Sequence, residues 1–159
     1  MGTTMPERTA EASAGAAEGG FVTLTVADQL CGVAVESVRD ILGEQSITRI
    51  PLAPPEIAGS LNLRGRIVTA IDLRRRLGLP DAPEGVRRMS VVAEQGSELY
   101  ALLVDQVSEV LSLPAETFER NPPTLPIQWA TYSLGVHRLE ERLMVVLDVG
   151  RVLALSQEC

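Results

Sequence analysis

The sequence contains few aromatic residues and no long apolar run. Only five of its 159 residues are aromatic (one tryptophan, two tyrosines and two phenylalanines), although 45% of the chain is hydrophobic. The core must therefore consist largely of aliphatic side chains, and the 13 glycines and 10 prolines favour many short elements over a few long helices. Because no apolar stretch approaches the ~20 residues of a membrane-spanning helix, we expect a soluble protein with no direct membrane insertion.

Positive charge is also scarce. The chain has 21 acidic and 14 basic residues, which gives a net charge of −7, and every base is an arginine because the sequence contains no lysine. A field of this sign repels phosphate backbones, so we expect no nucleic acid among the partners. A barrel that binds nucleic acid or polysaccharide would also need a basic face with aromatic residues. The absence of lysine excludes Schiff-base catalysis and lysine-dependent phosphate loops.

Groups suited to catalysis or metal binding are few. Cys31 and Cys159 form no disulfide framework, which favours a reducing, cytoplasmic location. The single histidine, His137, has no nucleophile beside it in the sequence and is interpreted as structural or exposed. One histidine and two distant cysteines do not make a metal site, and the chain has no GxSxG, Walker or GxGxxG motif. The sequence therefore predicts no enzyme activity, no metal and no cofactor; the alternative is a hydrolase assembled in space around His137.

The N-terminal segment differs in composition from the rest of the chain. Residues 1–20 are small and polar and include no apolar stretch, so we do not expect them to form a signal peptide. We expect a disordered tail that ends at Gly19-Gly20.

From Phe21 onward, alternating hydrophobic residues predict short strands separated by turns. Hairpins are expected around Asp28-Gln29 and around Arg64-Gly65. Prolines interrupt the pattern between these hairpins, and a one-turn helix is expected over residues 55–58.

Two aspartates follow predicted strands at equivalent places. Asp72 precedes a short helical segment over residues 73–77, and Asp148 precedes a similar segment near the C-terminus. Each can accept hydrogen bonds from backbone amides at the start of its helix. Two helix N-caps explain these residues better than a catalytic carboxylate pair.

The chain contains an internal repeat. Residues 99–111 repeat the pattern of residues 30–42 at an offset of 69, and the segment from Gly135 to Asp148 repeats that from Gly59 to Asp72 at an offset of 76. The seven extra residues fit the proline-rich stretch at 121–126. Each copy would supply about five short strands, which most readily close into a small barrel, with a groove between the two barrels.

Arginine side chains give two further hypotheses. The run Arg74-Arg75-Arg76 is interpreted as a solvated helix face, and the less favoured alternative is a site for an anion or an acidic partner. Arg64 lies at a predicted hairpin tip, where it could form an ion pair with Asp40 or remain an exposed turn residue. The spacing alone is compatible with either.

Five motifs, in order along the chain, resemble those of the CheW family of bacterial chemotaxis coupling proteins. They are Val38-Arg39-Asp40-Ile41, Ile47-Thr48-Arg49-Ile50-Pro51, Gly59-Ser60-Leu61-Asn62-Leu63-Arg64-Gly65, Ile71-Asp72-Leu73-Arg74 and Leu103-Val104-Asp105-Gln106-Val107-Ser108-Glu109-Val110-Leu111.

The resemblance implies an all-β fold of two SH3-like five-stranded β-barrels with short connecting helices. A CheW-like domain would cover residues 21–155 after the tail at 1–20. The first barrel would comprise about residues 21–80 and the second about residues 86–150, with a C-terminal segment at 149–155 that packs back.

The resemblance also implies a non-enzymatic adaptor. Such a protein would couple the cytoplasmic tip of methyl-accepting chemoreceptors to the histidine kinase CheA, whose regulatory domain has the same fold. It would be cytoplasmic, recruited to receptor arrays at the inner face of the membrane, monomeric when isolated and part of a ring or array with its partners. The alternative is a CheW-like scaffold of a related kinase pathway that controls surface motility or development.

Site residues follow from the same resemblance. The receptor-binding groove would comprise Val38, Asp40, Ile41, Arg64, Val104, Val107 and Val110. The kinase-binding surface would comprise Ile47, Arg49, Pro51, Ile57 and Gly59, the last at a position of close backbone approach. Asp40 stands where the family usually has glutamate.

Overall fold

The computed structural model describes residues 18–83, 85 and 87–154, which form eleven strands and five short helical segments. The strands are β1 (Gly19–Val26), β2 (Gln29–Ala34), β3 (Val38–Leu42), β4 (Ile57–Leu63), β5 (Arg66–Asp72), β6 (Met89–Gln95), β7 (Glu98–Val104), β8 (Gln106–Leu113), β9 (Phe118–Glu119), β10 (Ser133–Arg138) and β11 (Leu143–Leu147). The helices are α2 (Leu73–Arg76), α3 (Ile127–Ala130) and α4 (Val149–Val152), with 3₁₀ turns η1 (Val35–Ser37) and η2 (Ala115–Thr117).

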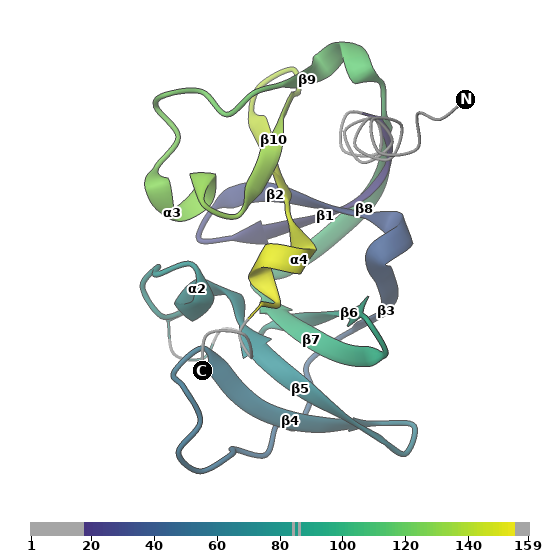
Figure 1. Ribbon diagram of the computed structural model, residues 1–159, viewed down its shortest axis with the longest axis vertical. Coiled ribbons are helices and arrows are strands. Elements are labelled where there is room, and N and C mark those ends of the chain that lie inside the picture. The colour runs from purple at the N-terminus through teal and green to yellow at the C-terminus, as the bar shows by residue number, and fades with distance from the viewer. Residues whose placement is uncertain (1–17, 84, 86, 155–159) are drawn as a thin grey trace, which may run out of the picture.

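The strands form two sheets, which confirms the predicted all-β class. One sheet has six strands in the order β8-β1-β2-β11-β10-β9, and the other has five in the order β3-β6-β7-β5-β4. Figure 1 shows the two sheets one above the other, with α2 and α4 between them. The sixth strand of the larger sheet is β9, a two-residue strand that pairs with β10.

The predicted division into barrels at residues 21–80 and 86–150 is wrong, because the two repeats exchange strands. β1 and β2 of the first repeat pair with β8 and β11 of the second, whereas β6 and β7 of the second repeat pair with β3 and β5 of the first. The short links β2–η1–β3 and β7–β8 carry the chain from one sheet to the other. In each sheet, strands of one repeat pair with strands of the other. This pairing covers strand edges that would otherwise be exposed to solvent.

The internal repeat is visible in the register of the strands. β3 pairs with β6 as β8 pairs with β1, and both pairs are antiparallel with a bulge at the equivalent place. The matched partners, 69 positions apart, are Val38 opposite Ala93 and Val107 opposite Leu24, then Ile41 opposite Val91 and Val110 opposite Val22. The duplication read from the sequence is therefore a repeat of structure as well.

The two predicted helix N-caps and the two predicted hairpins are present in the structure. Asp72 accepts a hydrogen bond from the backbone N–H of Arg75 at 3.4 Å, and Asp148 accepts one from that of Arg151 at 3.2 Å. The hairpins β1–β2 and β4–β5 lie where they were expected.

The one-turn helix predicted over residues 55–58 is wrong. The amide of Ile57 donates to the carbonyl of Pro54 at 3.0 Å, which closes a turn, and Ile57 then enters β4 opposite Ile71. Strand pairing outweighs the local preference of proline for a first helical turn.

Gly59 and Gly135 are a second pair of equivalent residues. Both have a positive φ, 149° and 150°, and both lie beside a register shift in their strand pair. A Cβ at Gly59 would collide with the backbone carbonyl of Thr48, so a side chain here would push the preceding loop off the sheet.

One aliphatic core joins the two sheets and their helices. Its buried members come from both repeats and include Leu73 of α2 and Val149 and Val152 of α4. Residues 149–154 thus pack against the sheets, while residue 155 lies outside the described residues. At the other end of the chain, Gly19 and Gly20 belong to β1, so they are not part of the tail that was expected to end with them. Residues 1–17 lie outside the described residues.

His137 is fully buried in β10, in agreement with its structural interpretation. Its ring lies between those of Phe21 and Phe118, with centroids 5.2 and 5.3 Å away. Its Nδ1 is 2.8 Å from the hydroxyl of Thr117.

Candidate protein-binding surfaces

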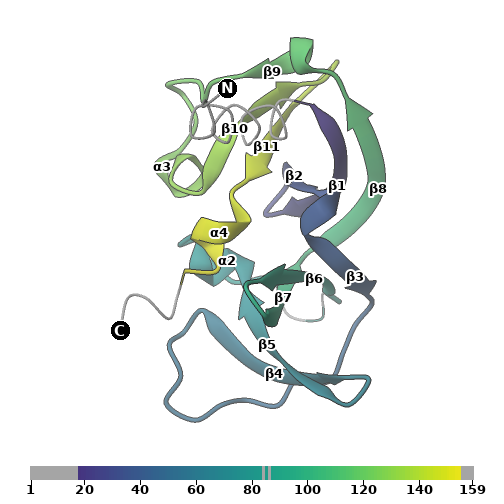
Figure 2. The ribbon, with the colours of Figure 1, turned by 45° about the vertical axis from the view of Figure 1, so that its right-hand side comes forward.

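The edge strands β3 and β8 carry most of the groove residues. Val38 and Val107 are half-buried and pack against the core, whereas Ile41 and Val110 are 38% and 58% exposed. The four form two equivalent pairs, because each residue of β8 lies 69 positions after its counterpart in β3. Each edge strand therefore presents an exposed apolar side chain. Figure 2 shows β8 and β3 one after the other along the same side of the molecule.

One groove assignment needs correction. Val104 ends β7 with no exposed surface and packs inside the core, so it cannot contact a partner directly. The family motif places Val104 close in sequence to the residues of β8. The chain passes from one sheet to the other between β7 and β8, however, so Val104 faces the core whereas Val110 of β8 is exposed.

Sequence reasoning missed Val35, which is 43% exposed in η1. A Cβ built on Gly20 would lie 3.4 Å from the Cγ1 of Val35 and 4.0 Å from that of Val110, so the two valines flank one glycine. In the sequence, Val35 continues the apolar run Val33-Ala34-Val35 and so resembles a strand residue. In the structure β2 ends at Ala34 and η1 begins at Val35, which leaves the Val35 side chain at the surface.

Asp40 and Arg64 form an ion pair, which decides between the two sequence alternatives. Arg64 Nη2 lies 3.1 Å from Asp40 Oδ2, and the Arg64 side chain is 80% exposed. Arg64 occupies the β4–β5 turn at φ 53°, where the side-chain oxygen of Asn62 accepts a hydrogen bond from the amide of Gly65. The pair lines a hollow of about 220 Å³ beside β3. Because the arginine is so exposed, we expect this pair to contribute little to stability.

Four of the five predicted kinase-surface residues lie around one hollow. Ile47, Arg49, Pro51 and Ile57 line a space of about 570 Å³ between the β3–β4 loop and the start of β4; we call it the loop hollow. Gly59, the fifth, is buried behind it. The loop is held to β4 by two backbone hydrogen bonds of 2.8 Å between Thr48 and Ser60.

The loop hollow also contains residues that the sequence did not predict. Arg75, Arg88 and Asp72 lie at its polar side, and Leu52 lies at its rim with its side chain fully exposed. Three prolines around Leu52 were the available signal, since they favour an exposed, rigid loop.

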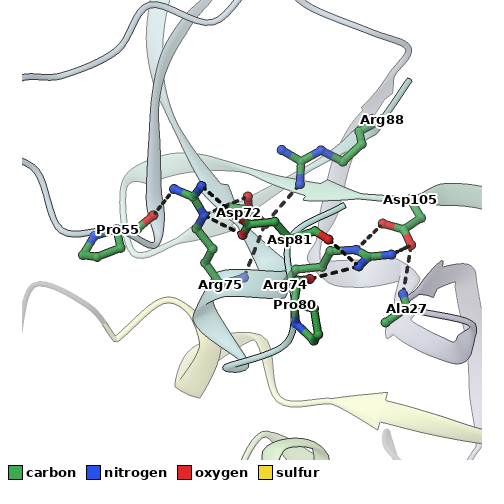
Figure 3. Close-up of polar contacts among 9 residues, drawn as sticks. All are labelled: Ala27, Pro55, Asp72, Arg74, Arg75, Pro80, Asp81, Arg88 and Asp105. Carbon is green, nitrogen blue, oxygen red and sulfur yellow. Dashed lines mark hydrogen bonds and ion pairs between the residues drawn. The ribbon is translucent and has the colours of Figure 1, made fainter. Parts of the chain in front are cut away.

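The interpretation of Arg74-Arg75-Arg76 as a solvated face is wrong for Arg74 and Arg76, whose side chains are largely buried, whereas Arg75 is exposed. Arg74 binds Asp105 with two contacts, Nε to Oδ1 at 3.0 Å and Nη2 to Oδ2 at 2.7 Å (Figure 3). Arg75 binds Asp81 in the same bidentate manner, at 2.9 and 3.1 Å. The fork of the guanidinium matches a carboxylate; Asp105 comes from a distant part of the chain, and Asp81 from the segment that follows the helix.

Arg76 links the two helices that lie between the sheets. It donates to the carbonyls of Val152 and Arg151, at 3.0 and 3.1 Å, and its guanidinium lies 5.1 Å from the centroid of the Tyr132 ring. These contacts satisfy carbonyls at the end of α4, as a cation near a helix C-terminus can do.

Asp105 joins three segments at the junction of the sheets. Besides Arg74, its Oδ2 accepts a hydrogen bond from the amide of Ala27 at 2.9 Å (Figure 3). Burial opposes ionisation of this carboxyl, but the hydrogen bonds from Arg74 and Ala27 outweigh it and hold the pKa of Asp105 below its ordinary value. Burial raises the pKa of the Cys31 thiol, which keeps it protonated at neutral pH.

Neither a cluster of possible metal ligands nor a membrane-spanning helix is found among residues 18–83, 85 and 87–154. Within those ranges, no group of three or more His, Cys, Asp or Glu side chains could hold a metal ion. Among the described helices, none is long and apolar enough to cross a membrane.

Comparisons of sequence place this geometry among known proteins. The family model described as the CheW-like domain matches residues 20–157. The chain is 33% identical to "Chemotaxis protein CheW" of Klebsiella aerogenes over 138 residues, which cover 86% of this chain and 82% of that protein. It is 30% identical to the protein of the same name from Rhizobium meliloti, over 83% of this chain and 85% of that protein. It is also 29% identical to "Protein PilI" of Pseudomonas aeruginosa, over 68% of this chain and 61% of that protein.

A solved structure has the same fold. The crystal structure of the scaffolding protein TtCheW from Thermoanaerobacter tengcongensis superposes with a TM-score of 0.74 at 27% sequence identity. The match covers 82% of this chain and 88% of that one.

Proposed function

The chain belongs to the CheW family and is a chemotaxis scaffold protein, and from this premise we propose that it couples methyl-accepting chemoreceptors to the histidine kinase CheA. One observation carries the proposal. The edge-strand residues Ile41 and Val110 and the loop hollow are separate outward surfaces on a single body, because each of its two sheets contains strands from both repeats. Two partners can therefore bind at the same time.

For the receptor we propose a surface of Val38, Ile41, Val107 and Val110, with Arg64 and Asp40 at one end. Apolar side chains on both edge strands suit the apolar face of a receptor helix, as in other helix-in-groove complexes. The exposed Arg64 guanidinium, fixed beside Asp40, would add a polar contact that selects orientation more than affinity.

For the kinase we propose the loop hollow, with Ile47, Arg49, Pro51 and Ile57 in contact and Gly59 allowing the loop to lie against β4. The regulatory domain of CheA, itself CheW-like, would dock there. The chain would act without enzymatic activity, in the cytoplasm, at receptor arrays on the inner face of the membrane. It would be monomeric when isolated and enter a ring or array with its partners.

Co-purification tests the proposal. The tagged chain should retain both the purified cytoplasmic fragment of a chemoreceptor and the purified kinase. Val107→Asp should lose the receptor fragment while it keeps the kinase, because a charge at this half-buried position opposes apolar contact. Val110→Asp is the matched variant at an exposed position, which leaves the core unaltered. A folded Val110→Asp protein that still binds the receptor fragment would refute the groove.

The similarity to Protein PilI supports one alternative, a scaffold of a related kinase pathway for surface motility or development. The same purification from the native cell discriminates between the two, because the co-purified receptor and kinase identify the pathway.

A further inference from the structure

Leu52 is a fully exposed leucine in an unusual backbone conformation. Its φ is 64°, in the left-handed region that glycine favours and leucine avoids. A large apolar side chain that is both exposed and conformationally unfavourable contributes nothing to folding at this position. Such residues persist where the surrounding structure holds them, and they concentrate at functional sites.

The loop around Leu52 is rigid. Pro51 precedes it, and Pro54 and Pro55 follow after Ala53. The amide of Ala53 donates to the carbonyl of Ile50 at 3.3 Å, which closes a turn over Leu52. The segment runs along the lower end of the molecule in Figures 1 and 2. Because the backbone is already ordered, little conformational entropy remains to be lost when a partner binds Leu52.

The surface beside Leu52 is positively charged on a protein of net charge −7. Three arginines line the loop hollow, Arg49, Arg75 and Arg88, against one carboxylate, that of Asp72. Arg75 is neutralised by Asp81, and Arg88 Nη1 lies 3.1 Å from Asp72 Oδ1. No described residue pairs with Arg49, which is exposed. An apolar residue flanked by an unneutralised guanidinium suits an apolar pocket with a carboxylate at its mouth.

We propose that Leu52 is the anchor of the kinase contact, inserted into an apolar pocket of the kinase regulatory domain, and that Arg49 pairs with a carboxylate at the edge of that pocket. This inference rests on the proposed function, since it names the chemistry by which the loop hollow recognises the kinase. A single apolar side chain at the centre of an interface commonly dominates its affinity.

Affinity for the purified kinase regulatory domain, measured by calorimetry, tests the inference. Leu52→Ala should weaken binding by roughly 10–30-fold, as expected for an anchor residue. Leu52→Gly should weaken it as much while the protein stays equally stable, because glycine accepts the left-handed conformation. Arg49→Glu should weaken binding by about tenfold and reduce its dependence on salt.

Two matched controls carry the same changes at remote exposed positions. Ile127→Ala on α3 and Arg142→Glu between β10 and β11 should bind the kinase domain as the native chain does. If the native chain fails to bind the kinase domain, the proposed function is wrong. If the native chain binds and Leu52→Ala binds equally well, only the anchor is refuted, and unchanged binding by Arg49→Glu refutes the carboxylate contact.

Discussion

Two ion pairs of the same chemistry show how burial decides the value of a residue. Arg64 and Asp40 meet at 3.1 Å with an exposed guanidinium, whereas Arg74 and Asp105 meet at 2.7 Å with 12% and 18% of their side chains exposed. Water and salt screen the first pair, and its side chains lose entropy when they are held together. The second pair is shielded and shares its carboxylate with the amide of Ala27.

For the exposed pair we expect weak coupling. A double-mutant cycle with Arg64→Ala and Asp40→Ala should give a coupling free energy of at most about 1 kcal/mol in chemical unfolding, and less at high salt. Urea denaturation of the four proteins measures it. A coupling of several kcal/mol would show that the pair is shielded in solution.

For the shielded pair we expect a pH-dependent contribution. Asp105→Asn should lower the free energy of unfolding by about 1–3 kcal/mol at pH 7, because Arg74 loses its charged partner. The folded-state pKa of Asp105 is lowered, so its stabilisation is complete above the unfolded value near 4 and is lost as the pH falls through the folded value. The native chain and the variant should therefore converge in acid.

Glu116→Gln, an exposed change in η2, is the control and should follow the native chain at every pH. If Asp105→Asn matched the native chain at pH 7 as well, the Arg74 contact would contribute nothing.

At the scale of elements, the sequence predicted features that depend on neighbouring residues, such as helix caps. It did not predict contacts between residues far apart in the chain. Asp72 and Asp148 were recognised as caps because a cap depends on residues within one turn. Arg74 was misread because its partner Asp105 is 31 residues away and its exposure depends on tertiary packing. Val104 was misassigned for the same reason: a sequence motif does not tell which side of a strand faces the core.

The two caps should differ in their contribution to stability. Asp148→Ala should cost about 1 kcal/mol, the usual value of an N-cap. Each cap also lies 3.8 Å from the arginine three residues later, but Asp72→Ala should cost more, because Asp72 is 5% exposed and forms a further ion pair with Arg88. Thermal unfolding of both variants gives the order, and equal costs would mean that the Arg88 contact and the burial of Asp72 add nothing.

At the scale of the whole molecule, the exchange of the hairpins β1–β2 and β6–β7 between the two repeats makes the two sheets one unit. The repeat was readable because its pattern recurs at a fixed offset, but the exchange was not. A strand that pairs with its own repeat has the same alternation as one that pairs with the other repeat, so only the three-dimensional structure distinguishes them.

The exchange predicts that neither half of the chain folds alone. Residues 18–83 and residues 87–154 each supply strands to both sheets, so a separate half lacks partners in each. Circular dichroism should show both halves unfolded when separate and a β-rich complex when they are mixed. A half that folds by itself would contradict the shared architecture.

The central claim is that one molecule binds receptor and kinase together through different surfaces, and co-sedimentation tests it directly. Receptor-bearing membranes should bring down the kinase only when the native chain is added. Val110→Asp should bind the kinase but not the receptor. Ile50→Asp, at the loop hollow, should bind the receptor but not the kinase. A mixture of the two variants should leave the kinase in the supernatant, because no single molecule retains both surfaces. Recovery of the kinase with the membranes in that mixture would contradict the account.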